Sequence, residues 1–266
     1  MDQAKHIWND LEKIRAQAPL VHNITNYVVM NSSANALLSL GASPVMAHAL
    51  EEVEEMVGIA QALVINIGTL SQPWIRSMIT AAKAAKRRGI PLILDPVGAG
   101  ATALRTKTAL SLLIEAPATI IRGNASEIRS LYLAEGATKG VDSRHTAEDA
   151  LGAAQALANL FGCVVSVSGP VDLIVGGDRV IRVTNGHPLM PRVTGLGCTA
   201  SALTGAFAAV NPSPLHAAAH AMAIMGIAGE MAAERAEGPG TLQLYFLDAL
   251  YRLSYDDIAK RLQWEE

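Results

Sequence analysis

Residues 62–68 read ALVINIG, a largely apolar run closed by glycine. An apolar run without polar alternation is typical of a strand that is buried on both faces of a parallel sheet. Similar runs occur at 91–96, 119–124 and 164–169, and longer helical patterns alternate with these runs along the chain. This alternation predicts βα units that build a mostly parallel sheet covered by helices.

One segment departs from the alternation. Between residues 171 and 184, two β-rich runs flank Gly176-Gly177-Asp178, a turn sequence that suits a hairpin. We therefore expect a small antiparallel pair beside the parallel strands. Because no Ser/Pro/Gly-rich linker, low-complexity block or internal repeat divides residues 1–266, the sequence predicts a single domain.

The composition narrows the class of partner. Hydrophobic residues make up 50% of the 266 residues, which suffices for a substantial core, whereas aromatic residues make up only 4%. So few aromatic side chains argue against a surface that stacks nucleic-acid bases. The formal net charge of −3 gives no electrostatic reason to expect nucleic acid or membrane lipid. We expect a small-molecule ligand.

The two cysteines, Cys163 and Cys198, are too few for a disulfide framework. The first residues lack the basic region and apolar stretch of a signal peptide, so a reducing, cytoplasmic setting is expected. The most apolar segment, 216–231, is interrupted by glycine and by polar and charged residues. It falls short of the roughly 20 apolar residues of a membrane span, and we interpret it as a buried, alanine-rich helix.

A glycine-rich turn precedes another apolar helical pattern, where residues 194–201 read TGLGCTAS. Glycines at the mouth of a helix let the backbone approach a ligand closely, and the unpaired amides of the first turn favour an anion such as phosphate. The same field would lower the pKa of Cys198, which makes this thiol a candidate base or nucleophile. The alternative is a small buried cysteine after a flexible turn.

Polar residues follow three of the predicted strands, and ligands of open α/β sheets bind beyond such strand ends. Asp95 begins the loop DPVGAG, and Arg122 and Glu127 bound the loop RGNASE. Two carboxylates, an arginine and an anion-binding helix start are the parts that phosphoryl transfer needs. Asp95 and Glu127 could act on Mg²⁺ directly or through water, and Arg122 could hold a nucleotide phosphate.

Each of these residues also has a purely structural interpretation. Asp95 before proline suits a turn. Asn124 and Glu127 have the spacing of a helix capping box. Arg122 could form a surface ion pair, and Ser168 could belong to a turn.

Four segments together resemble a known family: HNITNYV at 22–28, DPVGAG at 95–100, NASE at 124–127 and GLGC at 195–198. In kind and order they are similar to those of hydroxyethylthiazole kinases, of the ribokinase-like superfamily, and the likeness extends over essentially the whole chain. It implies a three-layer α/β/α fold. It also implies transfer of the γ-phosphate of ATP to the primary alcohol of 4-methyl-5-(2-hydroxyethyl)thiazole, a step of thiamine salvage that requires Mg²⁺.

The resemblance also implies roles for single residues, assigned by match of motif. It implies that Arg122, Ser168 and Asn124 bind ATP and that Asp95 and Glu127 organise the metal. It also implies that Met46 and Gly195 bind the thiazole, with Asn26 nearby. The catalytic turn would consist of Gly195, Gly197 and Cys198. Without the resemblance, a methionine such as Met46 is ordinary core packing.

The chain departs from the wider superfamily at Cys198, where most sugar and vitamin kinases have an aspartate that acts as base. A thiol has a higher reference pKa, about 8.5, and accepts hydrogen bonds weakly, so we expect a poorer base. A weak base suffices in a loose transition state, because bond breaking runs ahead of deprotonation of the nucleophile. We therefore expect the backbone amides from Gly195 to Cys198 to do most of the catalysis.

The resemblance further implies an assembly. Sugar kinases of the superfamily usually carry a small β lid near the start of the sheet, and residues 23–46 leave no room for one. Water still has to be excluded, because an open site hydrolyses ATP. A homotrimer, in which a neighbouring subunit covers the thiazole pocket, is the expected solution.

Three other functions stay open at this point. One is a kinase of the same fold that acts on another small alcohol, such as hydroxymethylpyrimidine or ribose. A second is an acyl-transfer enzyme with Cys198 as covalent nucleophile and His187, His216 or His220 as base. A third is a nucleotide-binding module without catalysis.

Overall fold

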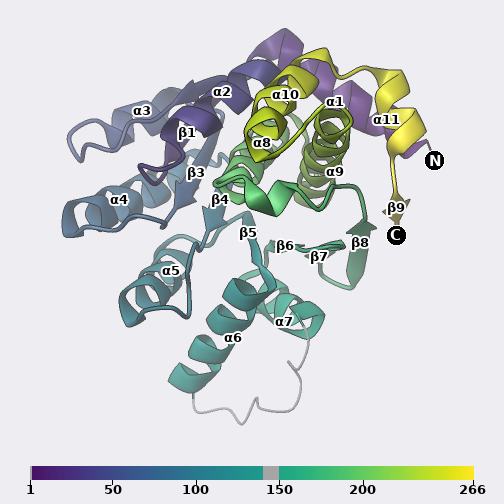
Figure 1. Cartoon of the computed structure of the whole chain (residues 1–266). Coiled ribbons are helices and arrows are strands. Elements are labelled where there is room, and N and C mark those ends of the chain that lie inside the picture. The colour runs from purple at the N-terminus through teal and green to yellow at the C-terminus, as the bar shows by residue number, and fades with distance from the viewer. Residues whose placement is uncertain (1, 140–149) are drawn as a thin grey trace.

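A single sheet organises the chain (Figure 1). The structure is a computed structural model that describes residues 2–139 and 150–266. Within these residues the first six strands in sheet order run parallel, and the last three run antiparallel to their neighbours. In sheet order the strands are β2 (Ser43–Val45), β1 (Leu20–Ile24), β3 (Ala62–Asn66), β4 (Leu92–Asp95), β5 (Ile120–Asn124), β6 (Val164–Ser168), β7 (Asp172–Gly176), β8 (Arg179–Val183) and β9 (Trp264–Glu265).

The strands predicted from apolar runs are confirmed as β3, β4, β5 and β6. All five residues of β3 are buried, as a run without polar alternation requires. The antiparallel hairpin is confirmed as β7 and β8, which pair from Asp172 with Val183 to Gly176 with Arg179. Gly177 in its turn has a φ of +59°, in the left-handed region that favours glycine.

Helices cover both faces of the sheet and enclose a separate apolar cluster on each face, which confirms the three-layer α/β/α arrangement. One face is covered by α1 (Gln3–Gln17), α2 (Met30–Leu40), α8 (Leu196–Val210), α9 (Pro214–Ala233), α10 (Pro239–Arg252) and α11 (Tyr255–Arg261). The other face is covered by α3 (Val53–Ile59), α4 (Gln72–Arg88), α5 (Ala103–Glu115), α6 (Ala125–Lys139) and α7 (Ala150–Phe161).

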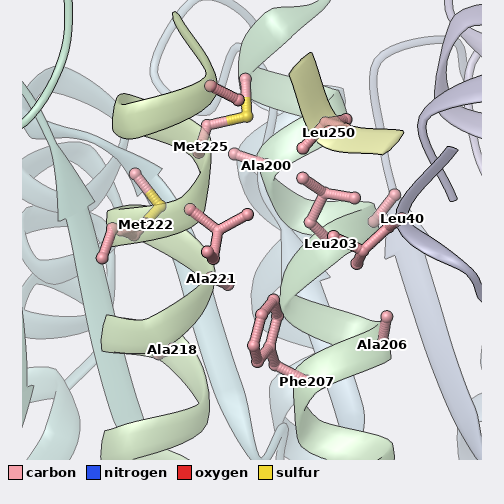
Figure 2. Packing of buried hydrophobic residues seen from close by; sticks show 14 of the residues in the cluster. Leu40, Ala200, Leu203, Ala206, Phe207, Ala218, Ala221, Met222, Met225 and Leu250 are labelled. Carbon is pink, nitrogen blue, oxygen red and sulfur yellow. The ribbon is translucent and has the colours of Figure 1, made fainter. Parts of the chain in front are cut away.

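Helix α8 lies at the centre of the first face. Figure 2 shows Leu203 and Phe207 of α8 between Ala218 and Ala221 of α9 on one side and Leu40 of α2 on the other. Small alanine side chains on α9 leave room for the ring of Phe207. Because α8 is packed on several sides, its first turn has a fixed place above the sheet.

The predicted alanine-rich helix at 216–231 is confirmed inside α9, most of whose residues are buried. This helix belongs to the core beside α8. Searched over the described residues, the chain contains no helix that is both long and apolar enough to cross a membrane.

The carboxyl ends of β3, β4, β5 and β6 meet at one edge of the sheet, and α8 begins at the same edge (Figure 1). The register places polar residues side by side there. Asn66 of β3 pairs with Asp95 of β4, and Asn124 of β5 pairs with Ser168 of β6. Paired residues of parallel strands point their side chains to the same face, so this edge gathers the polar groups.

Candidate active site

A cavity of about 420 Å³ lies between these strand ends and the first turn of α8. It is lined by every residue predicted for the site except Met46: Asn26, Asp95, Arg122, Asn124, Glu127, Ser168, Gly195, Gly197 and Cys198. These residues come from five separate parts of the sequence. The topology therefore brings together groups that the strand-end rule selected one by one.

Asp95 is the last residue of β4, and only 1% of its surface is exposed. Its Oδ2 accepts hydrogen bonds from Asn66 Nδ2 and from Ser201 Oγ, both at 2.7 Å. Burial raises the pKa of this carboxyl to about 7, although the charge of Arg122 and the hydroxyl of Ser201 act in the opposite direction. Such a buried, partly paired carboxylate lining a cavity is more than a turn residue.

Arg122 lies in β5 with 7% of its surface exposed, so a surface ion pair is the wrong interpretation. One of its terminal nitrogens, Nη1, donates to the carbonyl oxygen of Gly197 at 2.8 Å. Its Nε is buried without a hydrogen-bond partner in the described part of the chain. The guanidinium therefore holds the glycine turn, and it places a positive charge in the lining of the cavity, which favours an anion there.

Glu127 and Asn124 form the capping box that their spacing suggested. Glu127 Oε2 accepts from the Asn124 amide at 2.8 Å, and Asn124 Oδ1 accepts from the Glu127 amide at 3.0 Å. Glu127 Oε1 also accepts from the amide of Gly98 at 2.8 Å, which ties the loop after β4 to α6. Glu127 thus caps a helix and lines the cavity at the same time.

The carboxylates suit a cation that keeps most of its own water. Asp95 Oδ1 has no hydrogen-bond partner within the ranges that the structure describes, whereas both oxygens of Glu127 are occupied by amides. The same ranges contain no group of three or more His, Cys, Asp and Glu side chains that could hold a metal. Mg²⁺ fits this donor set, because it takes one or two carboxylates together with waters and substrate phosphates.

The predicted helix is confirmed as α8, but it begins at Leu196, so Gly197 and Cys198 lie in its first turn and not ahead of it as expected. The expected lowering of the pKa of Cys198 is wrong. Burial raises the pKa of the thiol to about 11, and the nearby carboxylate of Asp95 adds to the effect. The helix-start field is outweighed because the thiol is largely removed from water beside a negative charge, so little thiolate exists at neutral pH.

Both glycines of this turn lie close to neighbouring side chains. Gly195 has a φ of +84°, and a Cβ there would lie 2.5 Å from Val29 Cγ1. A Cβ on Gly197 would lie 3.0 Å from Nη1 of Arg122. The turn can thus approach both Val29 and Arg122, and the first-turn amides of a helix at such a place favour an anion.

Three residues in the site escaped the sequence reasoning. Asn66 and Ser201 bind Asp95, and Arg105 donates to the carbonyl oxygens of Val97 and Gly68 at 2.7 and 2.8 Å. Asn66 could have been found from the sequence, because it is a polar residue at the end of a predicted strand, and the strand that ends at Asp95 comes next along the chain. Ser201 could not, since it stands among many small residues of an apolar helix.

A larger cavity of about 910 Å³ adjoins the first and shares Arg122, Asn124 and Ser168 with it. It extends beneath the loop after β8 to α9, where methionines contribute to its lining. Ser168 Oγ donates to the carbonyl oxygen of Gly123 at 3.4 Å, which keeps this hydroxyl at the boundary of the two cavities. The pair of cavities offers a polar compartment joined to a more apolar one.

Met46 does not line either cavity. It directly follows β2, the edge strand of the sheet, and is half-buried. The loop that carries it is anchored by His22, whose Nε2 lies 2.7 Å from the carbonyl oxygen of Ala47. Within one chain, Met46 therefore lies at the end of the outermost strand and outside the two cavities that the other predicted site residues line.

The histidines give no support to an acyl-transfer site. His220 Nδ1 lies 2.8 Å from Asp10 Oδ2, and its ring meets that of Phe207, near the end of α8 opposite to Cys198. His216 contacts Ser213, and His187 lines only the larger cavity. The partners of the Cys198 thiol are instead amides: Asn26 Nδ2 lies 3.5 Å from Sγ, and the side chain of Asn66 also hydrogen-bonds to the thiol.

Comparisons with known proteins agree with this geometry. Residues 11–256 match the family model "Hydroxyethylthiazole kinase family". The hydroxyethylthiazole kinase of Syntrophus aciditrophicus is 64% identical over 260 residues, covering 97% of this chain and 96% of that protein. The hydroxyethylthiazole kinase of Nitratidesulfovibrio vulgaris strain Miyazaki F is 57% identical, over 99% and 98% of the two chains.

Solved structures are similar over the same length. The hydroxyethylthiazole kinase protein of Pyrococcus horikoshii superposes with a TM-score of 0.91 at 46% identity and covers 98% of both chains. A ribokinase-like superfamily protein of Enterococcus faecalis has a TM-score of 0.64 at 15% identity, over 91% of this chain and 93% of that one. The latter likeness concerns the fold alone.

Proposed function

Because the chain belongs to the hydroxyethylthiazole kinase family, we propose that it transfers the γ-phosphate of ATP to the primary alcohol of 4-methyl-5-(2-hydroxyethyl)thiazole in thiamine salvage. The observation that carries the proposal is the joint lining of one cavity by a free carboxylate oxygen of Asp95, the guanidinium of Arg122 and the glycine turn of α8. Residues 1–266 act as one catalytic domain, since strands from both ends of the chain share one sheet.

In this proposal, the residues of the smaller cavity hold the reacting groups. Arg122 and the amides from Gly195 to Cys198 bind the oxygens of the transferring phosphoryl group, where negative charge is spread in a loose transition state. Asp95 and Glu127 face the cation. Because Asp95 Oδ1 accepts no hydrogen bond in the described residues, it is the oxygen that would bind the cation directly or through water. When bound, Mg²⁺ supplies charge neutralisation at the nucleotide phosphates.

The nucleotide extends into the larger cavity. Ser168, Asn124 and Arg122 lie at the boundary of the two cavities, where the phosphates would pass from one to the other. The methionines of α9 offer an adaptable apolar lining for a flat base. This placement supports the roles in ATP binding that the family likeness implies for the three boundary residues.

Cys198 orients the acceptor hydroxyl instead of deprotonating it strongly. A thiol with a pKa near 11 holds its proton at neutral pH and donates or accepts only weak hydrogen bonds. A loose transition state needs little base strength, because the hydroxyl proton leaves late. The thiol thus stands where the alcohol must point, beside the amide of Asn26.

The thiazole is contacted by Gly195, Asn26 and a Met46 side chain that a neighbouring subunit supplies in a homotrimer. Two observations support this assembly. Met46 lies outside the cavities of its own chain, and Val28, which lines the smaller cavity, is 69% exposed next to Tyr27, which is 64% exposed. Apolar side chains left open beside a site that must exclude water are typical of a surface that a partner covers.

The test is a coupled assay of ADP release with and without the thiazole alcohol and Mg²⁺. We expect turnover that requires both, and a higher kcat/KM for the thiazole alcohol than for hydroxymethylpyrimidine or ribose. Preference for either comparator would replace the proposed acceptor, and ATP binding without a phosphorylated product would leave only a nucleotide-binding module. A fully active monomer by light scattering at the assay concentration would refute the shared pocket.

A further inference from the structure

Asp95 receives both of its side-chain hydrogen bonds on the same oxygen. Asn66 Nδ2 and Ser201 Oγ each lie 2.7 Å from Oδ2, while Oδ1 has no partner in the part of the chain that the structure describes. Two donors on one oxygen, from two directions, fix the rotation of the carboxylate. Oδ1 is then the oxygen that Asp95 presents to the cavity that it lines.

The two donors come from elements that do not move independently. Asn66 and Asp95 are register partners on adjacent parallel strands, so their side chains leave the sheet on the same face. Ser201 approaches from α8, one helical turn after Cys198. All three side chains of this cluster are at most 1% exposed, so water does not compete for these hydrogen bonds.

The same network reaches the thiol. Asn66 Oδ1 accepts from Asn26 Nδ2 at 2.9 Å and from the amide of Gly68 at 2.9 Å. Asn26 Nδ2 in turn lies 3.5 Å from Cys198 Sγ. A Cβ on Gly68 would lie 2.7 Å from Asn26 Nδ2, so glycine is required for this close approach. Because the oxygen of Asn66 is bound on one side and its nitrogen on the other, its amide has a single orientation.

We propose that Asn66 and Ser201 are positioning residues for the phosphoryl transfer. They hold Asp95 with Oδ1 toward the cation and the phosphates, and Asn66 sets the amide of Asn26 against the thiol of Cys198. The inference rests on the proposed function and names two residues on which the geometry of that site depends. Neither residue touches the reacting atoms itself.

The experiment compares Ser201→Ala and Asn66→Leu with a matched control, Thr204→Ala. Thr204 lies on the same helix and is as fully buried as Ser201, but its hydroxyl donates to the carbonyl oxygen of Ala200. We expect kcat to fall about 100-fold in both test variants, because a misplaced reacting group is costly, with the KM for the thiazole alcohol changed by less than about threefold. Ser201→Thr, which keeps the hydroxyl, should recover most of kcat.

A second readout does not depend on turnover. ADP binding is measured by calorimetry, once with Mg²⁺ and once with a chelator. The gain in affinity that Mg²⁺ gives should shrink about tenfold in both test variants, because residues that orient a metal-binding carboxylate contribute to metal affinity. Binding of ADP without metal should not change. Ser201→Cys, which keeps the volume but donates weakly, replaces the alanine variant if that variant shows no cooperative unfolding.

The outcomes separate the two proposals. If the unsubstituted protein does not turn over the thiazole alcohol, the proposed function fails and the positioning role fails with it. If it does, and Ser201→Ala matches Thr204→Ala in kcat and in the Mg²⁺ effect, only the positioning role is overturned. Wild-type behaviour of Asn66→Leu would overturn it as well.

Discussion

Two buried aspartates lie near opposite ends of α8 and are bound in different ways. Asp95 accepts a hydrogen bond from Ser201 in the first half of α8. Asp10 of α1 accepts one from the side chain of Asn211, which directly follows the last residue of α8. Only 1% of Asp95 and 4% of Asp10 is exposed. Their exposure is similar, but the protein surrounds the carboxyl of Asp95 more completely than that of Asp10, so both burial and partners contribute to their different pKa values.

Asp10 is bound on both oxygens. Lys13 donates to Oδ1, and Asn211 and His220 contact Oδ2. Burial opposes ionisation of Asp10, but the hydrogen bonds from these partners together outweigh it, and its pKa is lowered. In Asp95 burial prevails over the charge of Arg122 and the hydrogen bonds from Ser201 and Asn66, and the pKa rises to about 7. Both of those hydrogen bonds go to one oxygen.

The difference separates a structural carboxylate from one held ready for a ligand. Asp10 joins α1, the end of α8 and the start of α9, and its bonding capacity is used up within the protein. Asp95 has a free oxygen on a cavity, at an energetic cost that a bound cation would offset. Substitutions of Asp95 and of Asp10 test this contrast.

The largest expected effect is that of Asp95→Asn on activity. We expect kcat to fall at least about 10³-fold, because the variant loses the negative charge that faces the cation and the phosphates. The midpoint of thermal unfolding should stay the same or rise, since an uncompensated buried charge is removed. Steady-state kinetics and calorimetric unfolding of the same preparation check both halves, and retention of activity within about tenfold would contradict the role of Asp95.

Asp10→Ala should show the reverse pattern. Removing this carboxylate leaves the side chains of His220, Lys13 and Asn211 without their partner, and we expect the free energy of unfolding to fall by about 3–5 kcal/mol. Below its unfolding temperature the variant should keep its kcat. Urea titration at neutral pH measures the loss, with the milder Asp10→Asn as control because its amide oxygen can still accept. A large fall in kcat without loss of stability would contradict the purely structural role of Asp10.

The pH dependence of stability should differ in sign between the two sites. Below its folded pKa of about 7, metal-free Asp95 binds a proton that the unfolded chain releases near pH 4, so its contribution to stability falls as the pH rises from 4 to 7. Asp95→Asn should therefore gain stability over the unsubstituted protein, by about 2–4 kcal/mol above pH 7 and by almost nothing at pH 4.

Asp10 has the opposite sign because its folded pKa is lowered. Its contribution is present above the unfolded pKa, near 4, and is lost as the pH falls through the folded value. The stability deficit of Asp10→Ala should thus be full at pH 6 and shrink in acid. Urea unfolding from about pH 2 to pH 8 tests both variants, because the Asp10 contribution is lost only below its unfolded pKa. Parallel curves would show that the two carboxylates are in equivalent states.

Much of this arrangement could be predicted from the sequence, because strand ends and glycine turns are local signals. The apolar run at 62–68 and its three counterparts located the sheet, and Asp95 and Arg122 followed from the rule for strand ends. The hairpin followed from its turn residues in the same way. Local patterns therefore carried the fold and the edge at which the site lies.

What could not be predicted depends on contacts between distant segments. Ser201 contacts a residue 106 positions away, and nothing in an alanine-rich helix distinguishes it from its neighbours. The pKa of Cys198 was predicted in the wrong direction because its burial and the nearness of Asp95 are tertiary facts that a helix-start argument omits. The place of Met46 outside the cavities likewise depends on strand order.

The smallest expected effect concerns Cys198. Because the thiol is protonated at neutral pH, its removal costs orientation of the hydroxyl but no strong base, and Cys198→Ala should retain measurable turnover, within about tenfold to 100-fold of the unsubstituted protein. Cys198→Asp should keep or raise kcat, since a carboxylate is the better proton acceptor. Initial rates at saturating ATP check both, with Cys163→Ala as a control for removal of a buried thiol outside the cavity. Complete inactivity of both Cys198 variants would mean that the thiol itself, and not the surrounding amides, carries the transfer.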